Sequence, residues 1–358
     1  MLSSDFWKNK KVLITGHTGF KGSWILLFLL NLGAEVYGFS LEPNEKPNLF
    51  IDLYPDIRTK FTNFYGDICE YKLLEKYVTE ISPDVVIHLA AQPLVRESYK
   101  DPLLTWNTNV IGTLNLLESL KKLKSNCSVV IITTDKVYEN REWEHGYREN
   151  DQLGGSDPYS ASKASTELAV DSWRKSFCGS SSYQTKYLKI ASARAGNVIG
   201  GGDWAKDRII PDAIRYLKDS REILVRNPQS TRPWQHVVEP LCGYLILAEK
   251  LSLNDEKYYS AFNFGPNISN NKSVKDLISY ISESWPGSWV KMKNIDDSFK
   301  ESTLLHLQSE KAYKYLNWKS KLNFIQTIDL TLGWYKKYLD GQNAYQCCIE
   351  DITKYMSL

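Results

Sequence analysis

Tyr159 and Lys163 stand just before a stretch whose apolar residues recur with helical spacing, from Ala164 to Phe177. Two side chains at positions i and i+4 of a helix project from one face. A tyrosine hydroxyl, with a reference pKa of about 10, is a poor base at neutral pH. A nearby ammonium and a cationic nicotinamide both favour the phenolate. The pair therefore predicts a base that removes an alcohol proton while hydride leaves for NAD⁺.

Thr134 can hydrogen-bond the same substrate hydroxyl. It follows a predicted strand, Val129 to Thr133, whose carboxyl end should face the ligand. A Tyr-x-x-x-Lys pair by itself also fits an ordinary surface helix. Its place downstream of a Thr-Thr-Asp strand end favours the catalytic interpretation.

A glycine-rich turn near the N-terminus predicts the site that would hold the cofactor. Val12 to Thr15 reads as a short buried strand, and Gly16, Gly19 and Gly22 follow it, before the apolar helical stretch Ser23 to Leu32. In a dinucleotide site, one glycine makes the tight turn, another lets the pyrophosphate approach, and the third lets helix pack on strand. The helix N-terminus adds N–H groups and a positive dipole end.

Strands and helices then alternate along the chain, which is typical of a parallel sheet. The fold class predicted is α/β, a Rossmann-type doubly wound parallel sheet with a smaller, mixed α/β C-terminal domain for the substrate. The further predicted strands are Glu35–Phe39, Phe61–Tyr65, Pro83–Ala90, Val129–Thr133 and Tyr187–Arg194. Helices are expected over Tyr71–Ile81 and Leu103–Leu123, and the Gly-Ser run at 179–182 is expected to be a loop.

The strand ends indicate how a dinucleotide would bind. Ser40 or Glu42 would hold the adenosine ribose, and no arginine follows closely to bind a 2′-phosphate, so NAD is favoured over NADP. Asp67 fits either an acceptor for the adenine amino group or a helix N-cap. Asn109, in a helix-forming stretch, could order a buried water or a neighbouring backbone. The predicted cofactor-binding residues are Gly16, Thr18, Gly19, Phe20, Gly22, Ser40, Asp67, Ile68, Ala90, Ala91, Gln92, Asn109, Thr133, Tyr159 and Lys163.

Beyond residue 195 the alternation loosens. We therefore expect residues 1–195 to form the NAD-binding domain, with segments at about 230–265 returning to it, and residues 196–358 to form mainly the sugar-nucleotide domain. Helices are predicted over 210–217, 239–250, 274–285 and 325–340, with a strand over Ala261–Gly265.

Composition gives no support for several classes of function. The net charge is +2 and the basic residues are spread along the chain, which gives no support for a nucleic-acid or membrane-surface role. The N-terminus has no signal-peptide pattern, and the most apolar run, Trp24–Leu30, is too short for a membrane span. The six cysteines are scattered, so we expect reduced thiols in a cytoplasmic protein and no metal site.

Six motifs in about the first two-thirds of the chain resemble those of extended short-chain dehydrogenase/reductases, and more closely the CDP-glucose 4,6-dehydratase branch. They are Ile14-Thr-Gly-His-Thr-Gly-Phe-Lys-Gly-Ser-Trp24, His88-Leu-Ala-Ala-Gln-Pro93, Thr134-Asp-Lys-Val-Tyr-Glu-Asn140, Asp157-Pro-Tyr-Ser-Ala-Ser-Lys163, Arg194-Ala-Gly-Asn-Val-Ile-Gly-Gly-Gly-Asp-Trp204 and Arg232-Pro-Trp-Gln-His236. The first and third, with Gly-Gly-Gly-Asp-Trp, are specific to this branch.

The resemblance implies a cycle in which NAD is regenerated. Tyr159 takes the C4 hydroxyl proton as hydride leaves C4. The ketone acidifies the C5 hydrogen, water leaves from C5 and C6, and hydride returns to C6. The catalytic set implied is Thr134, Asp135, Lys136, Tyr159 and Lys163.

Asp135, if protonated, would be the acid of the elimination. Lys136 stands where dTDP-glucose relatives carry a glutamate base. It would act as the C5 base if its pKa were lowered, or as a cation that stabilises the enolate. Glu139 is a second candidate for the C5 base.

The resemblance also implies the substrate, CDP-glucose, and the residues that bind it. A diphosphate needs charge-assisted donors, which arginine forks supply. The predicted substrate-binding residues are Gln92, Arg194, Asn197, Arg208 and Arg232. A homodimer or a dimer of dimers is implied, pairing through helices that include the one bearing Tyr159, with a role in deoxysugar and O-antigen synthesis.

Two other classes of function stay open from the sequence alone. A nucleotide-sugar 4-epimerase, or a dehydratase of another NDP-hexose, would share Tyr159 and Lys163, but an epimerase has no need of Asp135 and Lys136. A non-enzymatic NAD-binding regulator would not need the Thr134, Tyr159 and Lys163 set.

Overall fold

A computed structural model describes residues 2–43, 46–179, 185–292 and 304–358. Most of the predicted loop at 179–182 lies outside the described residues. The chain builds one seven-stranded sheet in the order β11-β6-β5-β4-β1-β2-β3, and every neighbouring pair is parallel. The prediction of a doubly wound α/β fold is confirmed. The strands are β1 Lys11–Thr15, β2 Glu35–Ser40, β3 Thr62–Tyr65, β4 Val85–His88, β5 Cys127–Ile132, β6 Leu188–Ala195 and β11 Ala261–Phe264.

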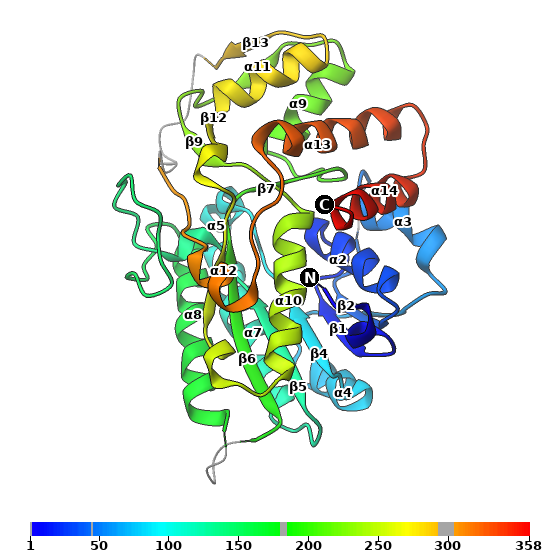
Figure 1. The fold of residues 1–358 in the computed structure, drawn as a ribbon, viewed down its shortest axis with the longest axis vertical. Coiled ribbons are helices and arrows are strands. Elements are labelled where there is room, and N and C mark those ends of the chain that lie inside the picture. The colour runs from blue at the N-terminus through cyan, green and yellow to red at the C-terminus, as the bar shows by residue number, and fades with distance from the viewer. Residues whose placement is uncertain (1, 44–45, 180–184, 293–303) are drawn as a thin grey trace.

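Helices cover both faces of this sheet, as the alternation of its side chains requires (Figure 1). In β1, Val12 and Ile14 belong to one apolar cluster, whereas Leu13 belongs to the other. Because both faces are buried, the central strands are near-continuous apolar runs. One face packs on α2 Phe20–Asn31 and α10 Val238–Ser252. The other packs on α4 Tyr71–Ile81, α7 Gly112–Leu120 and α8 Pro158–Phe177.

Three small two-stranded sheets form beyond β6, together with the helices in the upper part of Figure 1. They pair β7 Val198–Ile199 with β10 Gln235–His236, β8 Ile223–Val225 with β13 Trp289–Lys291, and β9 Thr231–Pro233 with β12 Asn271–Ser273. Helices α9 Ile209–Lys218, α11 Val274–Ser284 and α13 Phe324–Leu339 lie in this part. Helix α10 and strand β11 return to the main sheet, while the boundary at residue 195 stays a prediction.

The remaining helices are short or cover the edges. They are α1 Ser4–Trp7, α3 Leu49–Ile57, α5 Val95–Lys100, α6 Pro102–Trp106, α12 Glu310–Leu316 and α14 Ala344–Met356, with 3₁₀ turns η2 Asp135–Val137, η3 Glu256–Tyr258 and η4 Ile268–Asn270. Among the described residues, no helix has the length and apolar character needed to cross a lipid bilayer.

The glycine turn has the tight turn and the close helix–strand packing that its spacing predicted. Gly16 has φ +77°, and a Cβ there would lie 2.6 Å from the Ala90 nitrogen. A Cβ on Gly22 would lie 2.1 Å from the Gly16 oxygen, so this glycine permits close packing of helix on strand. A Cβ on Gly19 would meet nothing closer than the Gly16 oxygen at 3.4 Å, and Gly19 is exposed as the N-cap of α2. Gly19 is therefore the position that a ligand can approach.

Three of the predicted helices differ from those in the structure. Helix α2 begins at Phe20 rather than Ser23, and α8 begins at Pro158 rather than Ala164, because the Asp157 side chain caps it by accepting from Ser160 N. The single helix predicted over Leu103–Leu123 is three pieces, with a π-helical turn η1 at Asn107–Ile111 between α6 and α7. Such turns interrupt the α-helical ladder and occur often at functional sites.

The crowding at Gly22 gives a stability test. We expect Gly22→Ala to lower the free energy of unfolding by roughly 1–3 kcal/mol, because the added methyl overlaps the Gly16 carbonyl. Gly19→Ala is the matched control, since its methyl meets ordinary contacts. Urea titrations followed by circular dichroism would measure both. Equal losses of stability would contradict the assignment of the close contact to Gly22.

Candidate active site

A cleft of about 1460 Å³ opens at the carboxyl edge of the sheet. Its walls come from the ends of the central strands and from the segments that follow β6. Pockets for a single small molecule usually measure about 300–1,000 Å³. This cleft is large enough for two nucleotide-sized ligands.

Most of the residues predicted to bind the cofactor line this cleft. They are Gly16, Thr18, Gly19, Phe20, Gly22, Ser40, Asp67, Ile68, Ala90, Ala91, Gln92, Thr133, Tyr159 and Lys163. The N-cap of α2 makes no side-chain hydrogen bond, so the first N–H groups of that helix are available to an anion. These features fit a dinucleotide diphosphate.

The end of β2 carries hydroxyls rather than cations. Thr18 Oγ1 lies 2.7 Å from Ser40 Oγ and donates to the Leu41 carbonyl at 3.0 Å. Glu42, the alternative partner for the ribose, is exposed and lies outside the cleft lining. Asp67 lines the cleft, and its Oδ1 accepts from Cys69 N at 2.8 Å, so it caps the turn ahead of α4 while facing the cleft.

Asn109 does not line the cleft. It lies in the π-helical turn, buried, where its amide accepts from Gln92 N at 2.8 Å and donates to Ser162 Oγ at 2.9 Å. Its contacts are with backbone and hydroxyl groups, and it positions the loop after β4. The Gln92 amide is also used internally, by Thr105 and Leu94. Gln92 therefore shapes the cleft wall, and its binding role stays a prediction.

Thr134, Asp135 and Tyr159 all line the cleft and are almost completely buried. Thr134 Oγ1 donates to Asp135 Oδ1 at 2.9 Å, and the Thr134 hydroxyl lies close enough to Tyr159 to lower its pKa. Strand β5 ends just before Thr134, and the N-terminal turn of α8 delivers Tyr159. Residues distant in the sequence are thus brought together as the strand-end argument predicted.

Burial sets the ionisation of this group. It raises the pKa of Tyr159 to about 12, while the nearby Thr134 hydroxyl and the positive charge of Arg208 act in the opposite direction. It also raises the pKa of Asp135 above its ordinary value, although Lys136, Thr134 and Arg232 oppose the shift. A raised carboxyl pKa is what a general acid needs.

Lys163 lies one helical turn beyond Tyr159, and its Nζ donates to the Ile132 carbonyl at 3.2 Å. Burial lowers its pKa to about 8, with Glu167 opposing the shift. We expected the ammonium of Lys163 to favour the Tyr159 phenolate. In this structure Arg208 is a cation that favours the Tyr159 phenolate. The sequence analysis predicted Arg208 only as a residue that binds the sugar nucleotide.

Lys21 is a site residue that the sequence reasoning missed. It occupies the first turn of α2, inside the glycine motif, and lines the cleft. Burial is the main reason that the pKa of Lys21 falls to about 8. The positive charges of Arg208 and Lys163 also lower it, whereas the carboxylate of Asp135 raises it. Its position inside the glycine motif, between Phe20 and Gly22, is the sequence feature that could have identified Lys21 as a site residue.

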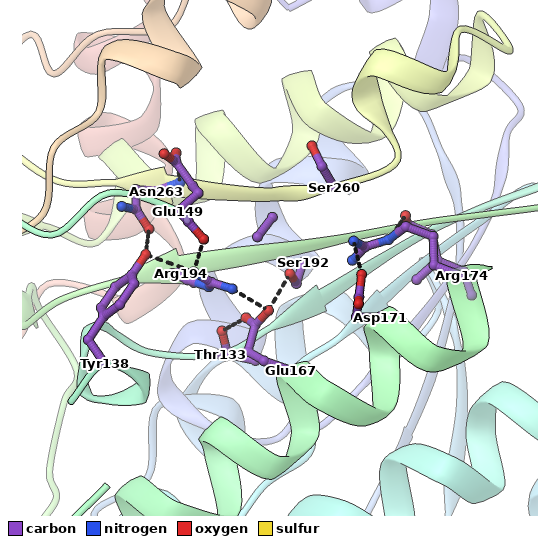
Figure 2. A network of polar contacts seen from close by, with 12 residues as sticks. Thr133, Tyr138, Glu149, Glu167, Asp171, Arg174, Ser192, Arg194, Ser260 and Asn263 are labelled. Atoms are coloured by element: carbon purple, nitrogen blue, oxygen red, sulfur yellow. Dashed lines mark hydrogen bonds and ion pairs between the residues drawn. The ribbon is translucent and has the colours of Figure 1, made fainter. Parts of the chain in front are cut away.

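The prediction that Arg194 binds the sugar nucleotide is wrong in this structure. Arg194 lies on β6 beneath the cleft, buried, and its guanidinium donates to Glu167 Oε2 at 2.8 Å (Figure 2). It also donates to the Tyr138 hydroxyl at 2.8 Å and to the Glu149 carbonyl at 3.0 Å. All three partners are protein groups, so Arg194 is structural.

Glu167 is the centre of that network. Its carboxylate accepts from Thr133, Ser192 and Arg194 (Figure 2). Burial alone would raise the pKa of Glu167, but Arg194 and the two hydroxyls lower it below its ordinary value. A fixed negative charge therefore sits one helical turn from Lys163 and ties α8 to β5 and β6.

The other end of the cleft is rich in arginine. Arg208 pairs with Asp203 at 2.8 Å, and Arg232 lies near enough to Asp135 to affect its pKa. Arg226, which the sequence analysis did not single out, also lines the cleft and contacts Asp207 at 3.3 Å. Asn197 is exposed and lines the cleft, and its role in binding the substrate stays a prediction.

Lys136 and Glu139, the alternatives for the C5 base, both line the cleft. Lys136 follows Asp135 directly and is half-buried, whereas Glu139 is exposed and lies 3.5 Å from Arg141. No cluster of three or more His, Cys, Asp or Glu side chains suited to a metal ion occurs among the described residues.

Comparison with known proteins relates this cleft to a family. A family model described as GDP-mannose 4,6 dehydratase matches residues 13–331. The chain belongs to the GDP-mannose 4,6 dehydratase family. Within this family, a CDP-glucose 4,6-dehydratase of Salmonella typhimurium (strain LT2) is 41% identical over 359 residues, covering 100% of this chain and 99% of that protein.

More distant matches are found among sequences and among solved structures. A UDP-glucose 4-epimerase of Halalkalibacterium halodurans is 25% identical, with 93% of this chain and 98% of that protein covered. The crystal structure of a dTDP-glucose 4,6-dehydratase from Bacillus anthracis in complex with NAD matches with TM-score 0.76 at 22% identity, covering 92% of this chain and 98% of that one. At that identity the likeness shows the fold.

The buried ammonium of Lys163 should cost stability. We expect Lys163→Met to raise the free energy of unfolding at pH 7 by roughly 2 kcal/mol, since burial disfavours the charge and the lost hydrogen bond to Ile132 offsets only part of that gain. Denaturant titrations across pH would measure it.

The pH dependence of the stability difference between Lys163→Met and the wild type provides a second check. The pKa of Lys163 falls from its ordinary 10.5 to about 8 on folding, so the cost is fully present below pH 8. Between those values the folded protein sheds the proton first, wild-type stability rises, and the advantage of Met shrinks. Lys76→Met, at an exposed position of α4, is the control. Equal changes in the free energy of unfolding for Lys163→Met and Lys76→Met across this pH range would contradict the assignment of the cost to the buried Lys163 ammonium.

Proposed function

We propose that this protein is a CDP-glucose 4,6-dehydratase that uses NAD and releases CDP-4-dehydro-6-deoxy-glucose. The observation that carries the proposal is the buried Asp135 carboxyl, which accepts a hydrogen bond from Thr134 and lines the same cleft as Tyr159. An epimerase or simple dehydrogenase needs only the base, whereas a dehydratase also needs an acid for the departing C6 hydroxyl. The identity of 41% over the whole chain to a CDP-glucose 4,6-dehydratase supports the same substrate.

The chain offers fitting groups to NAD. Gly19 and the N-terminal turn of α2 would hold the diphosphate, and Ser40 with Thr18 would face the adenosine ribose. The hydroxyls at the end of β2 favour NAD over NADP. When bound, NAD supplies a hydride acceptor for C4 and a hydride donor for C6.

Tyr159 and Asp135 divide the proton transfers between them. Tyr159 removes the C4 hydroxyl proton, and the charge of Arg208 favours its phenolate. Asp135 then protonates the C6 hydroxyl, so that it leaves as water. Lys136 or Glu139 takes the C5 proton and returns it, since both line the same cleft as Asp135. The arginines at 208, 226 and 232 suit the substrate diphosphate.

Product analysis tests this proposal. The protein would be incubated separately with CDP-glucose, dTDP-glucose, UDP-glucose and GDP-mannose, each with catalytic NAD⁺, and the products identified by mass spectrometry and NMR. We expect loss of water and a 4-keto-6-deoxy product from CDP-glucose alone, without accumulation of NADH. Interconversion of C4 epimers with no loss of water would establish the 4-epimerase instead.

The same assay on the Asp135→Asn variant distinguishes a dehydratase from a 4-epimerase. We expect dehydration to fall by roughly 10²–10⁴-fold, the usual contribution of a general acid, while the C4 hydroxyl is still oxidised and bound NADH appears in the absorbance spectrum. An epimerase would keep most of its activity in this variant. Turnover of any sugar nucleotide by the wild-type protein would exclude a binding-only regulator.

We further propose that the protein acts in the cytoplasm as a homodimer, in deoxysugar synthesis for surface polysaccharide such as O-antigen. Adjacent helices α6 and α8 and the turn η1 between α6 and α7 present large apolar side chains to solvent. These are Leu103, Leu104, Trp106, Ile111 and Leu168, which are 76%, 51%, 39%, 47% and 62% exposed. Exposed apolar groups gathered on neighbouring helices suit contact with a second copy of the chain.

Sedimentation of two matched variants tests the dimer. Leu168 on α8 and Leu253 after α10 are both 62% exposed. We expect Leu168→Glu to shift the protein to monomer, because the charge would be buried in the interface, and Leu253→Glu to leave the dimer intact. A wild-type monomer at micromolar concentration, or a dimer that survives Leu168→Glu, would contradict this interface.

A further inference from the structure

The first turn of α8 carries Tyr159, so the backbone of that turn decides where the tyrosine hydroxyl lies in the cleft. The first N–H groups of a helix have no partners within the helix, and uncapped ends fray. Pro158, at the first helical position, has no N–H group. The Asp157 side chain accepts from Ser160 N at 2.9 Å. The N–H group of Tyr159, between these two residues, therefore needs a partner from another part of the chain.

Ser98 of α5 supplies that partner. Its Oγ accepts from Tyr159 N at 3.2 Å and donates to the Val95 carbonyl at 2.6 Å, and the residue is 0% exposed. Because the single O–H of serine is used by Val95, its oxygen lone pairs are left for Tyr159 N. Helices α5 and α8 pack against each other, and this hydrogen bond joins them across 61 positions of the sequence.

The carbonyl group of Tyr159 is held as well. Ser162 Oγ donates to the Tyr159 carbonyl at 2.7 Å and accepts from Asn109 Nδ2 at 2.9 Å. Ser98 in α5 and Asn109 in η1 both belong to the segment between β4 and α7. This one segment therefore fixes the backbone of the tyrosine on both its N–H side and its carbonyl side.

The segment is itself braced where α5 begins. The Gln92 side chain accepts from Leu94 N at 2.6 Å and donates to the Leu94 carbonyl at 3.1 Å. Leu94 is the N-cap of α5, and its carbonyl also accepts from Ser98 N at 3.1 Å. Gln92 N in turn donates to Asn109 at 2.8 Å. Ser98 is thus tied to the loop that follows β4, although α5 is a short helix.

Ser98 has no direct access to the substrate. It lies outside the cleft lining, whereas its neighbours on α5 line the cleft, namely Val95, Arg96, Glu97 and Tyr99. Loss of the Ser98 hydroxyl would therefore remove no group that a ligand in the cleft could touch. It would instead release the N–H group of Tyr159 and loosen the first turn of α8.

We propose that Ser98 is a positioning residue for Tyr159. It would hold the tyrosine where its hydroxyl meets the C4 hydroxyl of the sugar, so its role rests on the proposed function of Tyr159 as the base. A misplacement of about 1 Å can cost about 10²-fold in rate, because the reacting atoms no longer meet in the productive geometry. Ser98 should therefore affect the rate of turnover and leave the affinity for the substrate unchanged.

The chain offers a matched pair of serines for the test. Ser119 on α7 is also 0% exposed, and its Oγ donates to the Asn115 carbonyl at 2.8 Å, much as Ser98 donates to Val95. Both Ser→Ala variants lose a buried hydroxyl and one hydrogen bond to a helix carbonyl. Only Ser98→Ala also loses the contact with Tyr159. The two variants should therefore lower the urea midpoint of unfolding to similar extents.

Steady-state kinetics with CDP-glucose then separate positioning from stability. Rates are counted per site that binds NAD, so that a loss of folded protein does not lower them. We expect Ser98→Ala to lower kcat by roughly 10- to 10²-fold with KM unchanged, and Ser119→Ala to keep the kcat of the wild type. Ser98→Thr keeps the hydroxyl, and Ser98→Cys keeps a weak sulfur acceptor. The kcat should therefore fall in the order Thr, Cys, Ala at residue 98, and the Cys variant provides the comparison if Ser98→Ala does not fold.

The possible outcomes distinguish this role from the reaction itself. Equal kcat values in the residue-98 variants and Ser119→Ala, or a higher KM with kcat unchanged, would overturn the positioning role and leave the dehydratase in place. Interconversion of C4 epimers by the wild type, with the same order of variants at residue 98, would overturn the dehydratase and support the positioning role. A wild type that turns over no sugar nucleotide would overturn both.

Discussion

The burial of several ionisable side chains at one edge of the sheet is the constraint on which this structure depends. Tyr159, Asp135, Lys163 and Lys21 all leave water on folding, and each has a pKa shifted toward its neutral form. An isolated buried charge would be prohibitively unstable, so these groups survive only as neighbours of one another. The same burial gives them pKa values suited to exchanging protons with a substrate.

Support for these groups comes from a second, deeper layer of polar contacts. Glu167 accepts from Thr133 and Ser192 and pairs with Arg194, so the helix that carries Tyr159 and Lys163 is fixed to two strands (Figure 2). A buried pair of this kind contributes little net stability, but loss of one partner is costly. Its value lies in holding the reacting groups in register, since small displacements are expensive in catalysis.

Backbone geometry makes the two ends of the cleft different. At the β1–α2 turn, glycines permit close contacts that any side chain would block, which leaves helix N–H groups open to an anion. Beyond β6, short strands and loops bring arginines to the opposite wall. One end therefore offers backbone N–H groups and a helix dipole, and the other offers guanidinium groups.

Local patterns in the sequence determined the parallel sheet, the glycine turn and the Tyr159–Lys163 pair, because strand runs, turn glycines and helical spacing act over a few residues. The placement of Thr134 beside Tyr159 also followed, since parallel strands end at one edge. Tertiary structure alone decided that Arg194 pairs with Glu167, that Asn109 holds the loop at Gln92, and that Lys21 lies near enough to Asp135 for that carboxyl to raise its pKa. Each of these arrangements joins residues far apart in the chain, and only the packing of helices on the sheet determines which distant groups meet.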